Sequence, residues 1–203
     1  MATADIIDEL AGVADNDRMK ALRDQRPKAR VNAQKSYEAL FEPSPPRGVI
    51  LQERNVIAVF VAGLHRDAPA LAHYQRALGA TGVLASVLDE EIARGAAAGP
   101  YGRYPEGPLS TENREGPSYQ VSTSNRDALG ARLPAALEHA HLLVFHPRDA
   151  DPRALKALRD AGWSTTDVVT LSQIVAFLTF QIRVAAGLRA LADSLVKHEE
   201  QLR

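Results

Sequence analysis

The apolar residues of this chain recur with the period of an α-helix along most of its length. The alternation of β-branched and polar residues that marks a strand is nearly absent. We therefore predict an all-α fold. The predicted helices cover residues 6–11, 17–23, 28–41, 49–64, 67–78 with Asp67 as the cap, 82–94, 126–145, 152–161, and a last long stretch from 164 to at least 191.

The run Glu42-Pro43-Ser44-Pro45-Pro46 must end the third helix, because proline removes a backbone donor and restricts the residue before it. We place a boundary here. Residues 1–46 are then an N-terminal helical arm. Residues 47–203 are the main domain, which opens with two helices joined by a short turn.

The last predicted helix is apolar on more than one face. Fifteen residues without a charge separate Asp167 from Arg183. Crossing a membrane takes about 20 mostly apolar residues, so we interpret this segment as a buried helix. A helix that is apolar on most sides needs cover that one small bundle barely provides. Self-association would supply that cover, and we expect a homo-oligomer.

Residues 95–124 form the longest stretch without a helical pattern. They hold five glycines and four prolines together with Tyr101, Tyr104 and Tyr119. Loops longer than about 15 residues are usually functional or disordered, and disordered segments are usually poor in aromatic residues. A mobile insertion is the alternative. We expect instead that this loop covers a pocket or a neighbouring subunit, with Tyr101 and Tyr104 in a lid that contacts substrate.

Composition narrows the chemistry. The 203 residues include no cysteine, which excludes a Cys nucleophile, a redox CxxC pair and a thiolate metal site. The net charge of -1 provides no excess of Lys and Arg for binding nucleic acid or an anionic membrane. A local basic excess at residues 17–35 is interpreted as a solvated face. Acidic residues stand at the N-terminus where a secretory signal would be basic and then apolar, so we expect a cytoplasmic protein.

Two titratable side chains, Glu53 and His73, lie on helical faces that are otherwise apolar or directed toward the hairpin interior. Glu53 shares a stripe with Ile57, Phe60 and Leu64, and a desolvated carboxylate has a raised pKa that suits acid or base chemistry. In the alternative, Glu53 lies in the first helical turn, favours the helix dipole and stays solvated. His73 is placed to face the hairpin interior, where Glu53 could reach it and share a proton near neutral pH. A hydrogen-bonded core histidine is the alternative for His73.

Two neighbours of this pair, His65 in the turn between the helices and Tyr74 beside His73, are candidate substrate-binding residues. A solvated helix end is the alternative for His65. Another titratable cluster comprises Glu138, His139, His141 and His146. On a helix, positions 139 and 141 point about 200° apart, so they do not chelate one ion as an i, i+4 pair would. We expect no metal and no other cofactor. Walker, GxGxxG, GxSxG and HExxH motifs are absent.

Two stretches carry a family resemblance. In the first, Gln52-Glu53-Arg54 opens an apolar helix that is followed by HYQRALG at residues 73–79. In the second, ALRDAGWS at residues 157–164 runs into the long apolar helix that carries Arg183. These stretches resemble the core hairpin and the C-terminal portion of the carboxymuconolactone decarboxylase (CMD) and alkylhydroperoxidase AhpD-like superfamily. The resemblance covers about two thirds of the chain.

The resemblance implies an AhpD-like helical bundle that assembles into trimers or hexamers. Peroxidase members use a Glu, a CxxC pair on the hairpin and a His four residues after the second Cys. Counted back from His73, the two cysteine positions fall on Pro69 and Arg66. Both thiols are absent, while Glu53 and His73 match the rest of the pattern to within one residue of spacing.

The implied activity is therefore decarboxylase-like lyase or isomerase chemistry on a small organic molecule, rather than thiol peroxidase chemistry. Glu53 and His73 would be the catalytic acid–base pair. The alternative is a non-catalytic subunit or binding module that partners a thiol-bearing AhpD-like peroxidase.

Overall fold

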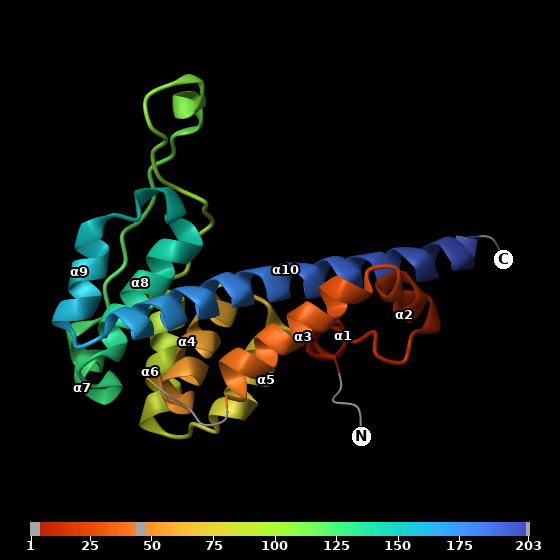
Figure 1. Cartoon of the computed structure of the whole chain (residues 1–203), viewed down its shortest axis with the longest axis horizontal. Coiled ribbons are helices and arrows are strands. Elements are labelled where there is room, and N and C mark those ends of the chain that lie inside the picture. The colour runs from red at the N-terminus through yellow and green to blue at the C-terminus, as the bar shows by residue number, and fades with distance from the viewer. Residues whose placement is uncertain (1–4, 44–47, 202–203) are drawn as a thin grey trace.

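A computed structural model describes residues 5–43 and 48–201 as a helical protein (Figure 1). Its helices are α1 (Ile6–Ala11), α2 (Asp17–Asp24), α3 (Pro27–Phe41), α4 (Leu51–Leu64), α5 (Ala68–Leu78), α6 (Val83–Arg94), α7 (Arg126–Leu129), α8 (Leu133–Phe145), α9 (Pro152–Asp160) and α10 (Thr165–Gln201). Over the described ranges no strand forms, which confirms the all-α prediction. Part of the predicted proline boundary, residues 44–47, lies outside the described residues.

Helix α10 is the axis of the fold. It contacts α1, α3, α4, α8 and α9, and Figure 1 shows α1–α3 along its C-terminal half and α8 and α9 beside its N-terminal half. Its side chains Leu171, Ile174 and Leu178 are fully buried. By length and composition alone, Thr165–Lys197 is also a candidate membrane span. The core helix of a folded domain meets the same criterion. In this structure 39% of the apolar window is buried, and α10 contacts five other helices.

A network of ion pairs ties the N-terminal helices together. Arg23 and Arg30 each contact the carboxylates of Asp5 and Asp8, at N–O distances of 2.6–3.0 Å. The Asp5 carboxylate also caps α1 by accepting hydrogen bonds from the first backbone amides of the helix. Two cations of the basic run at 17–35 are therefore paired inside the arm. Helix α1 in turn packs on α5 and α10.

The hairpin of α4 and α5 begins and ends as its sequence predicts. The Asp67 carboxylate accepts a hydrogen bond from Ala70 N at 3.0 Å, and it forms an ion pair with Arg189 of α10. Gly79 ends α5 in the left-handed region, with φ at 61°. Between the two helices Arg66 also has a positive φ, 56°. A left-handed backbone costs an L-residue about 1–2 kcal/mol, so this arginine stands where glycine would be less strained.

The predicted helix over residues 126–145 is wrong in one respect, because it is two helices. Gly130 has φ at 75° and ends α7, and Pro134 lies in the first turn of α8. Helix α2 begins at Asp17 as predicted, and the Asn16 side chain caps it by accepting a hydrogen bond from Met19 N. The division of the helix at Gly130 comes from local turn geometry that helical periodicity does not encode.

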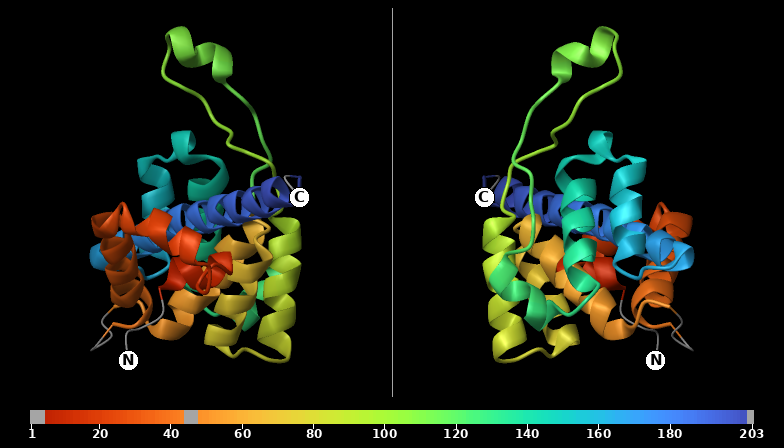
Figure 2. Two further views of the ribbon diagram at one scale, coloured as in Figure 1. Left: turned by 90° about the vertical axis from the view of Figure 1, so that its right-hand side faces the viewer. Right: turned by 90° about the vertical axis from the view of Figure 1, so that its left-hand side faces the viewer.

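The middle of the segment after α6 projects from the helices, and its two ends line pockets, at residues 97–100 and 118–119. Residues 102–115 leave the helices as a projecting arm (Figure 2), and its two legs pair with each other through hydrogen bonds between Gly102 and Arg114. Tyr101 is buried at the base of the arm, where its Oη accepts a hydrogen bond from Ala98 N. Tyr104 lies within the projecting arm, and the centre of its ring is 4.0 Å from Cζ of the Arg148 guanidinium. The two legs are held to each other by these hydrogen bonds, and the cover of a pocket or of a neighbouring subunit by this segment stays a prediction.

Candidate functional site

Glu53 is engaged at the start of α4. Its carboxylate accepts a hydrogen bond from Ile50 N at 3.2 Å and forms an ion pair with Arg132 Nε at 3.0 Å. Arg132 also pairs with Asp167 at 3.2 Å and lies 4.1 Å from the centre of the Trp163 ring. The side chain of Glu53 therefore acts as a first-turn carboxylate that ties α4 to the starts of α8 and α10.

His73 belongs to a different cluster. Its Nε2 lies 3.0 Å from Tyr37 Oη, and its Nδ1 lies 3.6 Å from Glu9 Oε1. Burial lowers the pKa of His73, and the negative charge of Glu9 opposes that shift. The expected Glu53–His73 pair is not formed, because the N-terminal helices α1 and α3 supply the partners of His73 while Arg132 engages Glu53.

The predicted substrate-binding residues are placed in different surroundings. Tyr74 is sealed in the core between α5 and α10, where its Oη donates a hydrogen bond to Gln181 Oε1 at 2.6 Å. Tyr104 lies in the projecting arm at residues 102–115, and Tyr101 is buried at the base of that arm. His65, by contrast, lines a pocket.

The pocket at His65 has a volume of about 230 Å³. It lies between the C-terminal end of α4, residues 97–100, the end of α8 and the middle of α10. Apolar groups from Leu64, Val144 and Phe145 line one part of it, and His65, Arg66 and Arg183 supply its charged and titratable groups. We call it the arginine pocket.

The charge of the arginine pocket is positive. The Arg66 and Arg183 side chains are exposed, and neither has an acidic partner within residues 5–43 and 48–197. No carboxylate side chain is among the groups lining the described pocket. Strained backbone that persists is often found at functional sites, and Arg66 occupies the left-handed position after a helix that usually takes glycine. Two guanidinium groups without an acidic partner, at one pocket with a partly apolar lining, are suited to hold an organic anion.

His65 is held beside these cations as a neutral imidazole. Its Nε2 lies 3.2 Å from Thr179 Oγ1. Burial lowers the pKa of His65, the charge of Arg183 lowers it further, and Asp67 partly opposes both. A neutral imidazole can accept a proton, and it can return that proton once charged. The contact to Thr179 leaves Nδ1 for a ligand.

No protein-family model matches the chain, and no curated protein matches it. What the chain does must therefore be inferred from its own residues.

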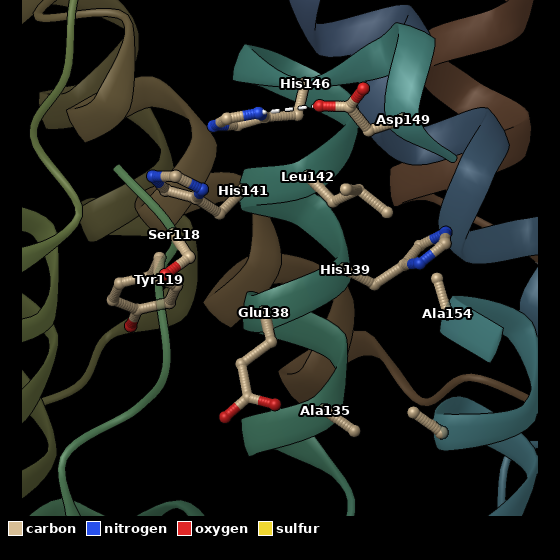
Figure 3. A pocket seen from close by; sticks show the side chains of 11 residues that line it. Ser118, Tyr119, Ala135, Glu138, His139, His141, Leu142, His146, Asp149 and Ala154 are labelled. Atoms are coloured by element: carbon tan, nitrogen blue, oxygen red, sulfur yellow. Dashed lines mark hydrogen bonds and ion pairs between the residues drawn. The ribbon is translucent and has the colours of Figure 1, made fainter. Parts of the chain in front are cut away.

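The histidines of α8 point away from one another. Figure 3 shows His139 and His141 on opposite sides of the helix, as their spacing predicts. Within the part of the chain that the structure describes, no group of three or more His, Asp or Glu side chains is placed to hold a metal ion.

Proposed function

We propose that this chain is a cysteine-free relative of the CMD and AhpD-like proteins that binds a small organic anion in the arginine pocket and exchanges a proton with it through His65. The observation that carries the proposal is the pair of guanidinium groups of Arg66 and Arg183, which line one pocket beside a neutral imidazole. The family placement rests on the sequence resemblance of residues 53–79 and 155–188 alone.

The chemistry of the pocket fits a carboxylate with an apolar body. Guanidinium groups bind carboxylates through charge-assisted hydrogen bonds, and Leu64, Val144 and Phe145 offer apolar contact for the rest of the molecule. With the carboxylate held by the arginines, a C–H bond next to it would lie near His65. Its proton would move to the imidazole, and the electron pair would stay on the substrate as an enolate that the two cations stabilise.

This assignment keeps the expected class of reaction, a lyase or isomerase step that begins with proton transfer, and changes the residues. His65 takes the acid–base role. Glu53 and His73 position helices, because their charged or hydrogen-bonded partners lie in clusters away from the arginine pocket.

Replacing Arg66 with Gly separates a binding arginine from a structural one. We expect the affinity for benzoate, a simple aromatic carboxylate, to fall by about tenfold, because one charge-assisted hydrogen bond contributes roughly 1.5–3 kcal/mol. We expect the free energy of unfolding to stay the same or to rise by about 1 kcal/mol, since glycine relieves the left-handed backbone. Calorimetric titration and thermal unfolding measure the two effects.

The control for this variant is Arg159→Gln, which removes a charge from an exposed site on α9. It should leave benzoate affinity unchanged. Unaltered benzoate binding by Arg66→Gly, or a loss of stability above about 1 kcal/mol, would show that Arg66 holds the turn and not a ligand.

The chain is also proposed to self-associate through α10. Val169, Phe180 and Leu191 are 38–52% exposed, and their spacing of 11 residues, about three helical turns, places them on one face. Trimers or hexamers are the assemblies that the family resemblance implies. A second candidate function, a non-catalytic subunit that partners a thiol-bearing AhpD-like protein, would use this same exposed face.

Replacing Phe180 with Glu should reduce the mass of the particle to that of one chain, because a buried unpaired carboxylate opposes association. Light scattering coupled to size exclusion gives the mass directly. The matched control is Ala190→Glu, which adds the same charge at an exposed position about 80° around the helix. Equal masses for both variants would argue against this face.

A further inference from the structure

A second cavity, of about 430 Å³, lies between α8, α9 and residues 118–119, and the proposed function does not use it. Figure 3 shows Tyr119 and His141 on one side of α8 and His139 on the other, next to Ala154 of α9. Small side chains at Ala135, Ala154 and Ala157 leave the space open. The volume lies in the range of about 300–1,000 Å³ that is usual for small-molecule sites. We call it the α8–α9 cavity.

One side of the α8–α9 cavity is a row of fixed rings. Tyr119 stacks on His141 with ring centres 4.9 Å apart and planes inclined by 25°, and His146 lies 6.2 Å beyond His141. Each ring is tied by a polar atom. Tyr119 Oη donates to Glu91 at 2.7 Å, His141 Nε2 lies 3.1 Å from the carbonyl oxygen of Gly95, and His146 Nδ1 lies 3.0 Å from Asp149. His141 itself is only 3% exposed, so the ring surface that this side offers to a ligand belongs mainly to Tyr119 and His146, and it suits contact with another planar ring.

The lining carries little free charge. No Lys or Arg side chain is among the groups lining the described cavity, in contrast to the arginine pocket. Its two carboxylates are already engaged, Glu138 with Arg126 and with Val121 N, and Asp149 with His146. Burial lowers the pKa of His141 to about 4, against a smaller opposing effect of the Gly95 carbonyl, so this ring is neutral at pH 7. An anion would find no cation here, and an uncharged ligand avoids the cost of burying an unpaired charge.

His139 is the polar group that lacks a partner. The residue is 5% exposed, its Nδ1 is buried without a hydrogen bond, and over the described part of the chain no group bonds its Nε2. Burial lowers the pKa of His139, so the imidazole is neutral and has one N–H and one acceptor nitrogen. Buried polar groups in folded proteins are nearly always satisfied by protein or by a bound molecule. Since Nδ1 is sealed within the protein, a ligand hydroxyl in the cavity would bond Nε2.

From this geometry we propose that the α8–α9 cavity is a second binding site, for an uncharged aromatic molecule with a hydroxyl group. The hydroxyl group hydrogen-bonds His139, and the aromatic ring extends from there over Leu142 toward Tyr119 and His146. The site lies apart from Arg66 and Arg183 and requires neither of them.

Phenol is a suitable probe, because it is uncharged at pH 7.5 and carries one hydroxyl. With histidine labelled in the imidazole ring, NMR titration should show that phenol shifts the signal of His139 and leaves the signal of His65 unchanged. Benzoate should shift His65 instead. Replacing Ala157 with Leu fills the cavity and should weaken phenol binding at least tenfold, whereas Ala21→Leu, at an exposed site on α2, should not.

A second variant tests the hydrogen bond itself. His139→Leu removes a buried polar group without a partner, so the protein is expected to fold at least as stably. Wild-type protein should bind phenol about tenfold more tightly than toluene, which lacks the hydroxyl, and the variant should lose this preference. Three results would overturn the proposal: no shift of His139 at saturating phenol, wild-type affinity in Ala157→Leu, or displacement of phenol by benzoate. Loss of benzoate binding alone would affect only the arginine pocket.

Discussion

Replacing Glu91 with Ala is expected to lower the free energy of unfolding by about 3–5 kcal/mol. Glu91 is fully buried in α6. Its carboxylate accepts hydrogen bonds from Tyr119 Oη at 2.7 Å, from Ser122 N at 3.1 Å and from Asn125 Nδ2 at 2.8 Å. The variant would leave these donors without their acceptor and would free the end of the long loop from α6.

Chemical denaturation measures this loss, with Asp89→Ala as the control. Asp89 is exposed on the same helix, and its replacement should change stability by less than about 0.5 kcal/mol. A loss below about 1 kcal/mol in Glu91→Ala would mean that the loop is held by other contacts.

The same carboxylate should make stability depend on pH. Burial by itself would raise the pKa of Glu91, but hydrogen bonds from Tyr119, Ser122 and Asn125 outweigh it and hold the pKa below its ordinary value. The folded pKa is then below the unfolded one, so this contribution is present above about pH 4.5 and is lost as pH falls. Below that pH the free energy of unfolding should fall more steeply for the wild type than for Glu91→Gln. Parallel plots of unfolding free energy against pH for the two proteins would contradict this.

Removing both arginines of the pocket, in the variant Arg66→Gln with Arg183→Gln, should weaken benzoate binding by at least about 100-fold. Each guanidinium contributes a charge-assisted hydrogen bond of roughly 1.5–3 kcal/mol, and tenfold in affinity corresponds to about 1.4 kcal/mol. Both side chains are exposed, so the fold should be kept. Calorimetry at two salt concentrations measures the effect and its electrostatic origin.

Two controls accompany the double variant, a separate single variant and a second ligand. Arg159→Gln loses one charge at an exposed position elsewhere and should bind benzoate as the wild type does. Phenol binding should also be unchanged in the double variant. If benzoate affinity falls by less than about threefold, the arginines do not form an anion site.

Helical periodicity and end signals were enough to predict most of the fold. Asp67, Gly79 and Pro152 stand at helix ends where local chemistry decides the conformation, and they do so in the structure. The break at Gly130 was missed, because a single glycine within an apolar pattern is compatible with a continuous helix. The projecting arm at 102–115 was missed because pairing of its two legs depends on hydrogen bonds that composition does not reveal.

The candidate site was harder to predict, because its partners come from distant parts of the chain. Glu53 and His73 do not pair with each other as expected. Each contacts a residue that is remote in sequence instead, Glu53 with Arg132 and His73 with Glu9. His65 was predicted as a ligand-binding residue, and it lines the arginine pocket. One signal for Arg66 was present in the sequence. The proposed family resemblance would place Arg66 at a position where the peroxidases have a thiol.

The central claim is that His65 and the two arginines meet one anion, and a titration of His65 by NMR with and without benzoate tests it most directly. Burial and Arg183 hold the pKa of free His65 below its ordinary value. A carboxylate stays ionised above about pH 5, and its negative charge beside the ring favours the imidazolium. We expect saturating benzoate to raise the pKa of His65, and benzoate affinity to increase as pH falls toward that pKa. An unchanged His65 pKa at saturating benzoate, or a shift of His73 in its place, would contradict the account.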